Sequence, residues 1–111
     1  MTQHLSVHLE GHLTRAKLAS ALTAATTARA KGAAAILVDA SEMISYDLDA
    51  RHAFVEWIRE AAPSKVAILT ERGMWRMVIA AMGMAATVPM QAFGERDAAE
   101  RWLSADDTSK G

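Results

Sequence analysis

Two short runs of uninterrupted apolar residues constrain the fold of this chain more than any other feature of its sequence. They are Ala-Ile-Leu-Val at 35–38 and Val-Ala-Ile-Leu at 66–69. A strand that is apolar on both faces is typical of a parallel sheet with helices on either side. We therefore expect both runs to be central strands, with Val38 and Ile68 buried.

Strand and helix patterns alternate around these runs. Residues 5–9 alternate apolar and polar side chains, which is the period of a half-buried strand. Residues 88–93 predict a strand near the sheet edge, because Pro89 has no amide hydrogen for the ladder. Apolar residues at helical spacing mark four further segments, at 15–31, 47–61, 74–86 and 97–103.

The order β-α-β-α-β-α-β-α predicts an α/β fold with a four- to five-stranded, mostly parallel sheet flanked by four helices. The N-terminal strand is the one that we consider for an antiparallel position. We expect residues 42–46 to form a loop. Asp47 or Asp49 should then cap the second helix, and Asp97 should cap the last one.

Length and composition limit the functional classes. A chain of 111 residues predicts one domain, here 1–104, followed by a flexible tail at 105–111. The formal charge is 12 − 13 = −1 with mixed signs, so we expect no nucleic-acid partner. The absence of cysteine excludes disulfides and thiolate chemistry. Without a signal-peptide pattern or a membrane-length apolar run, a cytoplasmic protein is expected.

Several segments, taken in order, resemble STAS domains, the domains of bacterial anti-sigma-factor antagonists and anion-transporter tails. Residues 7–14 are similar to the opening strand and Gly-x-Leu-Asp turn, and Ile36-Leu37-Val38-Asp39-Ala40-Ser41 to the central strand. The helix at 73–82 and the ending Ala98-Ala99-Glu100-Arg101-Trp102-Leu103 resemble the SpoIIAA-like branch. The resemblance implies a STAS/SpoIIAA-like fold and a binding or regulatory module that is not an enzyme and uses no cofactor.

The chain departs from the family at the phosphorylation switch. In phospho-regulated STAS proteins the second helix begins Asp-Ser-Ser-Gly, which falls here on Asp47-Leu48-Asp49-Ala50. Asp47 matches, but both serines and the glycine are absent, so regulated phosphorylation does not carry over. The SpoIIAA-like resemblance then implies a carrier or binding role for an apolar or lipid-like small molecule. The alternative is an anti-sigma-factor antagonist-type regulator of another protein that lacks the phosphoserine switch.

Polar residues gather after the first apolar run, where parallel sheets commonly bind ligands. Taken singly, such aspartates and serines more often make turn and cap hydrogen bonds, and we favour that interpretation for each. As a group they are the candidate surface for a ligand or partner. They are Asp39, Ser41, Ser45, Tyr46, Asp47 and Asp49.

The helix at 74–86 carries apolar residues on more than one face. Ordinary packing on the sheet is one explanation. The other is a homodimer contact or an apolar pocket, because methionine is common at adaptable binding surfaces. We expect Trp75 and Met77 to line it, with Met74 alongside and Arg76 at its rim.

His4, His8 and His12 share one face of the first predicted strand. Successive positions on that face lie about 7 Å apart, which is wide for shared metal ligation. We therefore favour a solvated strand face and predict no metal site. We also recognise no Ser-His-Asp set and no Gly-rich phosphate loop, so no catalytic residues are predicted.

Overall fold

The computed structural model describes residues 4–29 and 35–105, so the predicted tail beyond residue 105 lies outside the described part. Strands and helices alternate as predicted. In chain order they are β1 (His4–Leu13), α1 (Arg15–Arg29), β2 (Ala35–Tyr46), α2 (Leu48–Ala61), β3 (Lys65–Leu69), the 3₁₀ turn η1 (Gly73–Trp75), α3 (Arg76–Ala86), β4 (Met90–Phe93) and α4 (Arg96–Ser104).

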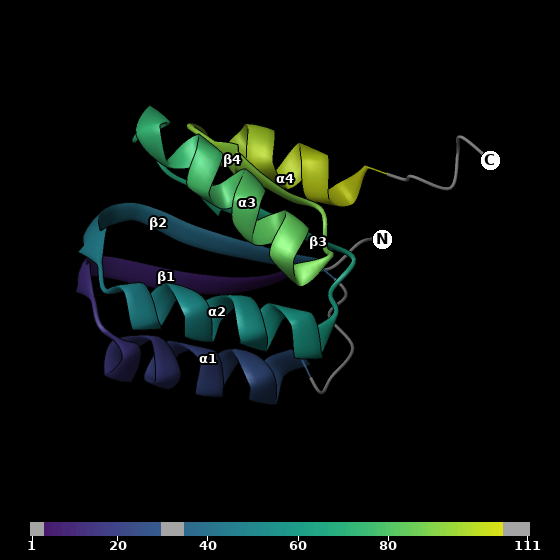
Figure 1. The fold of residues 1–111 in the computed structure, drawn as a ribbon. Helices are drawn as coiled ribbons and strands as arrows, with labels where there is room; N and C mark the ends of the chain where they lie inside the picture. The colour runs from purple at the N-terminus through teal and green to yellow at the C-terminus, as the bar shows by residue number, and fades with distance from the viewer. Residues whose placement is uncertain (1–3, 30–34, 106–111) are drawn as a thin grey trace.

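The four strands form one sheet in the order β1-β2-β3-β4, and every neighbouring pair is parallel (Figure 1). The antiparallel position considered for the N-terminal strand is wrong, because α1 carries the chain back to the starting end before β2 begins. Crossovers between parallel strands are almost always right-handed, so strands in chain order receive their connecting helices on one face. Accordingly α1, α2 and α3 cover one face, and α4 covers the other.

The sheet separates two cores. Successive residues of β2 point alternately into the two cores. Ile36 and Val38 face α1–α3, and Ala35 and Leu37 face α4. Val38 is only 2% exposed and Ile68 only 5%, so both runs are buried central strands as predicted. Continuous apolarity is required at these positions because each face is covered by helix.

Strands β1 and β2 continue as a two-stranded ribbon beyond the ends of β3 and β4. Asp39 pairs with Leu69, the last residue of β3, but β2 runs on to Tyr46. The predicted loop at 42–46 is therefore wrong. Two register shifts each add one residue to β2 relative to β1, and these bulges break the alternation that would mark a strand in the sequence.

The first residues of α2 and α4 can be compared with the predicted helix caps. Asp47 is the N-cap residue of α2, but its side chain makes no capping hydrogen bond, and Asp49 lies in the first turn. Glu95, rather than Asp97, precedes α4. Strand β4 is an edge strand, and Pro89 lies just before it. Among the residues that the structure describes, no helix has the length and apolarity to cross a membrane.

Candidate functional site

An apolar pocket lies between the sheet and helices α2 and α3. It encloses about 60 Å³, and its walls are formed by apolar atoms. A space of this kind suits a hydrocarbon group better than water, because water needs polar partners. The lining residues are Leu9, Val38, Ala40 and Ile68 from the sheet, Tyr46 at the end of β2, Arg51 and Phe54 of α2, Trp75 of η1, and Val78, Ile79 and Met82 of α3.

Trp75 lines this pocket and makes two ring contacts. Its ring packs edge-on against Tyr46, with centroids 5.8 Å apart. The Arg72 guanidinium lies 5.6 Å from the Trp75 ring centroid, and its Nε donates to the Met43 carbonyl at 3.3 Å. The turn before α3 therefore contacts the C-terminal part of β2 through Trp75 and Arg72.

A wider surface groove runs between α2 and α3 and meets the pocket. It has a volume of about 550 Å³. Arg51, Val78 and Met82 line both spaces, so a molecule in the groove would touch the side chains that border the pocket. The other groove residues are His52, Val55, Glu56 and Arg59 of α2, and Met77, Ala81 and Ala85 of α3.

Helix α3 buries one stripe and exposes most of the rest of its surface. Its buried residues are Ile79, Gly83 and Ala86. Met77 is 83% exposed and Met84 81% exposed, although both are large apolar side chains. Exposed apolar side chains commonly mark an interaction site only where they form a contiguous patch.

The four residues near the start of this helix that were predicted to line a contact or pocket lie in different surroundings. Trp75 lines the pocket and Met77 lines the groove. Met74 is 78% exposed in η1. Arg76 is exposed and is not among the lining residues of either space, whereas Arg51 lines both.

The polar group predicted after the first apolar run does not form one surface. Asp39 and Ser41 lie on the sheet face opposite the pocket, where Asp39 Oδ1 accepts bonds from the Ser41 amide at 3.1 Å and hydroxyl at 2.6 Å. Asp39 Oδ2 lies 3.6 Å from both His8 Nδ1 and Arg96. Tyr46 belongs to the pocket, and Asp49 is exposed at the start of α2.

Asp39 is held in its charged form by these neighbours. Burial alone would raise the pKa of the Asp39 carboxyl, but the two hydrogen bonds from Ser41 and the nearby His8 and Arg96 more than offset this. The pKa of Asp39 is therefore below its usual value, and the side chain is a carboxylate at neutral pH.

His12 joins Ser45 and Asp47. Its Nε2 lies 2.7 Å from Asp47 Oδ1, and its Nδ1 lies 2.6 Å from Ser45 Oγ. A carboxylate only accepts, so His12 Nε2–H donates to Asp47, while Nδ1 is hydrogen-bonded to the Ser45 hydroxyl. The fold brings these three residues together although Ser45 and Asp47 are 33 and 35 positions from His12, so no Ser-His-Asp order is recognisable in the sequence.

This set lies outside both apolar spaces and has a structural role. His12 and Asp47 side chains are each about half exposed, and the Asp47 amide also donates to the Leu13 carbonyl at 2.9 Å. These bonds tie the end of β1 to the start of α2. Ser45, His12 and Asp47 are absent from the linings of the pocket and the groove.

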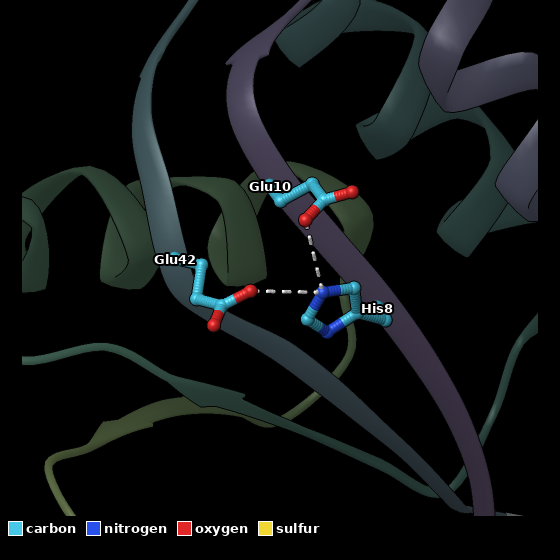
Figure 2. A group of neighbouring side chains, drawn as sticks. All are labelled: His8, Glu10 and Glu42. Carbon is cyan, nitrogen blue, oxygen red and sulfur yellow. Dashed lines mark ion pairs between the residues drawn. The ribbon is translucent and has the colours of Figure 1, made fainter.

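His8 lies apart from His12, between two glutamates on the open face of the β1–β2 ribbon (Figure 2). Its Nε2 is 3.4 Å from Glu42 Oε1 and 3.8 Å from Glu10 Oε2. The predicted histidine face therefore divides into two separate clusters. The side chain of His4 lies outside the described part of the chain.

A family model described as SpoIIAA-like matches residues 4–104, which is nearly the whole chain. The chain belongs to the SpoIIAA-like family. A solved structure of an uncharacterized DUF3478-family protein from Shewanella loihica PV-4, described as having a SpoIIAA-like fold, matches with a TM-score of 0.73 and 17% identity. The match covers 90% of this chain and 83% of that one, and at this identity it shows the fold alone. No curated protein matches the chain.

Sequence reasoning about this SpoIIAA-like protein missed Arg51, Val55 and Met82 as site residues. Helical spacing is the only signal that they carry, since Met82 follows Val78 by four positions and Val55 follows Arg51 by four. That spacing places each pair on one side of its helix. It does not say that the two sides face each other across a groove.

Proposed function

We propose that this SpoIIAA-like protein is a non-enzymatic binding module that holds an apolar, lipid-like small molecule between α2 and α3. The observation that carries the proposal is the sharing of Val78 and Met82 by the apolar pocket and the open groove. A hydrocarbon chain lying in the groove can insert its end between these side chains. Methionine side chains suit this role because they adapt to irregular partners.

The two volumes define how such a ligand lies. Pockets that enclose a drug-sized ligand measure about 300–1,000 Å³. The pocket here, about 60 Å³, accommodates only the end of a chain, whereas the groove, about 550 Å³, accommodates its body. The proposed ligand is therefore a linear molecule that remains partly exposed along α2 and α3.

Arg51 supports a polar head on this ligand. It lines both spaces, and no polar atom faces the pocket, so in this proposal its guanidinium pairs with a carboxylate or phosphate on the groove side. Arg59, also in the groove, is already engaged with Glu56 at 3.1 Å and with the Ala85 carbonyl at 2.9 Å. Arg51 is therefore our choice for the residue that orients an acidic head group.

The test is equilibrium binding of a fluorescent long-chain fatty acid to the parent protein and to two matched variants. Met77→Glu introduces a charge into the groove, whereas Met84→Glu introduces it at an equally exposed position that lines neither space. We expect Met77→Glu to weaken binding at least about tenfold, because a chain bound in the groove would cover this exposed position and remove the carboxylate from water. Met84→Glu should bind like the parent. Absence of binding to the parent, or equal losses in both variants, would contradict the proposal.

A second candidate function is protein contact, either with a second copy or with a regulatory partner. It is favoured by exposed apolar side chains outside the groove, since Met74 and Met84 are 78% and 81% exposed and Ile44 is 63% exposed. The same variants separate the two functions. If Met84→Glu abolishes self-association measured by light scattering and leaves fatty-acid binding intact, α3 also serves as a dimer surface.

A further inference from the structure

A histidine and two glutamates converge on the open face of the β1–β2 ribbon, on the side of the sheet opposite the pocket (Figure 2). A bulge creates this arrangement. His8 pairs with Asp39, but Glu10 pairs with Glu42. Between these two pairs β2 therefore advances by three residues while β1 advances by two. Regular alternation would have placed Ser41 opposite Glu10, and the extra residue brings Glu42 there instead.

The spacing of the three polar atoms suits a small divalent ion. His8 Nε2 lies 3.4 Å from Glu42 Oε1 and 3.8 Å from Glu10 Oε2, and all three ligand atoms lie within 4.8 Å of one another. A tetrahedral zinc ion with bonds of about 2.0–2.1 Å holds its ligands roughly 3.3 Å apart. The Glu42 oxygen is already near that separation. Both glutamates are about two-thirds exposed, so a small rotation of the Glu10 side chain brings its carboxylate oxygen to this distance from His8 Nε2 and from Glu42 Oε1.

The other ring nitrogen of His8 has the neighbour that metal-binding histidines usually have. His8 Nδ1 lies 3.6 Å from Asp39 Oδ2. Asp39 is in turn fixed by two hydrogen bonds from Ser41 and lies 3.6 Å from Arg96. The separation is longer than a hydrogen bond, but a small rotation of the half-exposed His8 ring would let Nδ1–H donate to Asp39, which leaves the Nε2 lone pair for a metal.

We propose that His8, Glu10 and Glu42 bind one Zn²⁺ ion, with Asp39 orienting the His8 ring and water completing the coordination. The mixed imidazole and carboxylate set favours zinc over Mg²⁺ or Ca²⁺, which prefer oxygen ligands alone. This reverses our preference for a plain solvated strand face, which rested on the distance between successive histidines. The site is independent of the proposed ligand groove, since the two lie on opposite faces of the sheet.

The test is calorimetric titration of the chelator-treated, tag-free chain with Zn²⁺, together with Co²⁺ absorption as a report of the coordination sphere. We expect one equivalent to bind. His8→Gln and Glu42→Gln should each weaken Zn²⁺ binding at least about tenfold. Asp39→Asn should weaken it by about 10- to 100-fold, as loss of an outer-shell partner does.

His12→Gln is the matched control. His12 lies on the same strand, is as exposed as His8, and also faces a carboxylate, Asp47. It should leave Zn²⁺ affinity unchanged, and far-UV circular dichroism should show every variant folded. No Zn²⁺ binding by the parent would overturn the proposal and leave the three side chains as neighbours on a solvated strand face. Unchanged affinity in His8→Gln, or an equal loss in His12→Gln, would also overturn it.

Discussion

Tyr46 and Trp75 meet edge to face, with their ring centroids 5.8 Å apart and their planes inclined at 66°. This contact joins the last residue of β2 to the turn that precedes α3. Both rings line the apolar pocket, so one aromatic pair contacts the start of α3 and forms part of the pocket wall. The pocket therefore depends on how the long β2 strand ends.

Removal of the Trp75 ring should destabilise the protein and open the pocket. Full burial of such a ring would predict a loss of about 3–5 kcal/mol for Trp→Ala. Trp75 is only partly buried, so we expect Trp75→Ala to cost about 1–3 kcal/mol in urea unfolding. Tyr46→Phe keeps the aromatic contact and should change the unfolding free energy by less than about 0.5 kcal/mol. Similar stability of Trp75→Ala and the parent would contradict a structural role for the pair.

Gly83 should resist substitution although it lies inside a helix. Alanine usually stabilises an interior helical position by about 1 kcal/mol relative to glycine. Here an added Cβ would lie 2.9 Å from Met90 Cβ and 3.1 Å from the Val88 carbonyl oxygen, neither of which is the free end of a side chain. We expect overpacking to dominate and Gly83→Ala to destabilise by about 1–2 kcal/mol net.

Gly73→Ala provides the comparison for Gly83→Ala, because nothing lies within 4 Å of the position that its Cβ would take. Its unfolding free energy should stay within about 0.5 kcal/mol of the parent value. A stabilised Gly83→Ala protein would show that α3 is free to move away from β4.

Lys65 should contribute to stability through its ammonium group. It is buried at 6% exposure, and Nζ donates to the carbonyls of Trp102 at 2.8 Å and Ala105 at 3.1 Å. Both carbonyls lie at the C-terminal end of α4, where a cation is favoured, and the Trp102 carbonyl also accepts from the Ala105 amide at 3.3 Å. Lys65→Met keeps most of the side-chain volume but leaves both acceptors without that donor, so we expect a loss of about 1–3 kcal/mol.

Lys17→Met is the control for Lys65→Met. Lys17 is exposed and donates to a single carbonyl, that of His12, at 3.1 Å. Its replacement should cost less than about 1 kcal/mol in the same denaturation experiment. An equal loss in the two variants would show that the burial of Lys65 does not increase its contribution to the free energy of unfolding.

The Ser45–His12–Asp47 set should not act as a hydrolase. A serine nucleophile needs a bound substrate and donors for the developing oxyanion, and Ser45 is not part of the lining of either apolar space. We expect p-nitrophenyl acetate hydrolysis by the parent to equal that of His12→Gln. Saturable hydrolysis that disappears in both His12→Gln and Ser45→Ala would show that the set is catalytic.

The sequence predicted the layers of this fold well because apolar runs respond directly to burial. The runs at 35–38 and 66–69 are buried on both faces, and their lengths and flanking residues marked them as strands. The ribbon at 42–46 was missed because each bulge inserts a residue that breaks the period of two. No local rule places such an insertion.

The candidate site was only partly predictable for a related reason. Spacing along α3 placed Trp75 and Met77 among the apolar candidates, and they line the pocket and the groove respectively. The contribution of Arg51 depends on how far α2 stands from α3. The contact between His8 and Glu42 depends on strand register. Both are properties of tertiary packing, and neither leaves a pattern in one segment.

If α2 and α3 hold an apolar chain, methyl NMR of the parent protein with a long-chain fatty acid should detect it. We predict intermolecular contacts from the acyl chain to the methyl groups of Met77, Val78 and Met82. Met84, equally exposed but outside both spaces, should show none. Contacts concentrated at Met84, or no contacts to Val78 and Met82 at saturating fatty acid, would contradict the account.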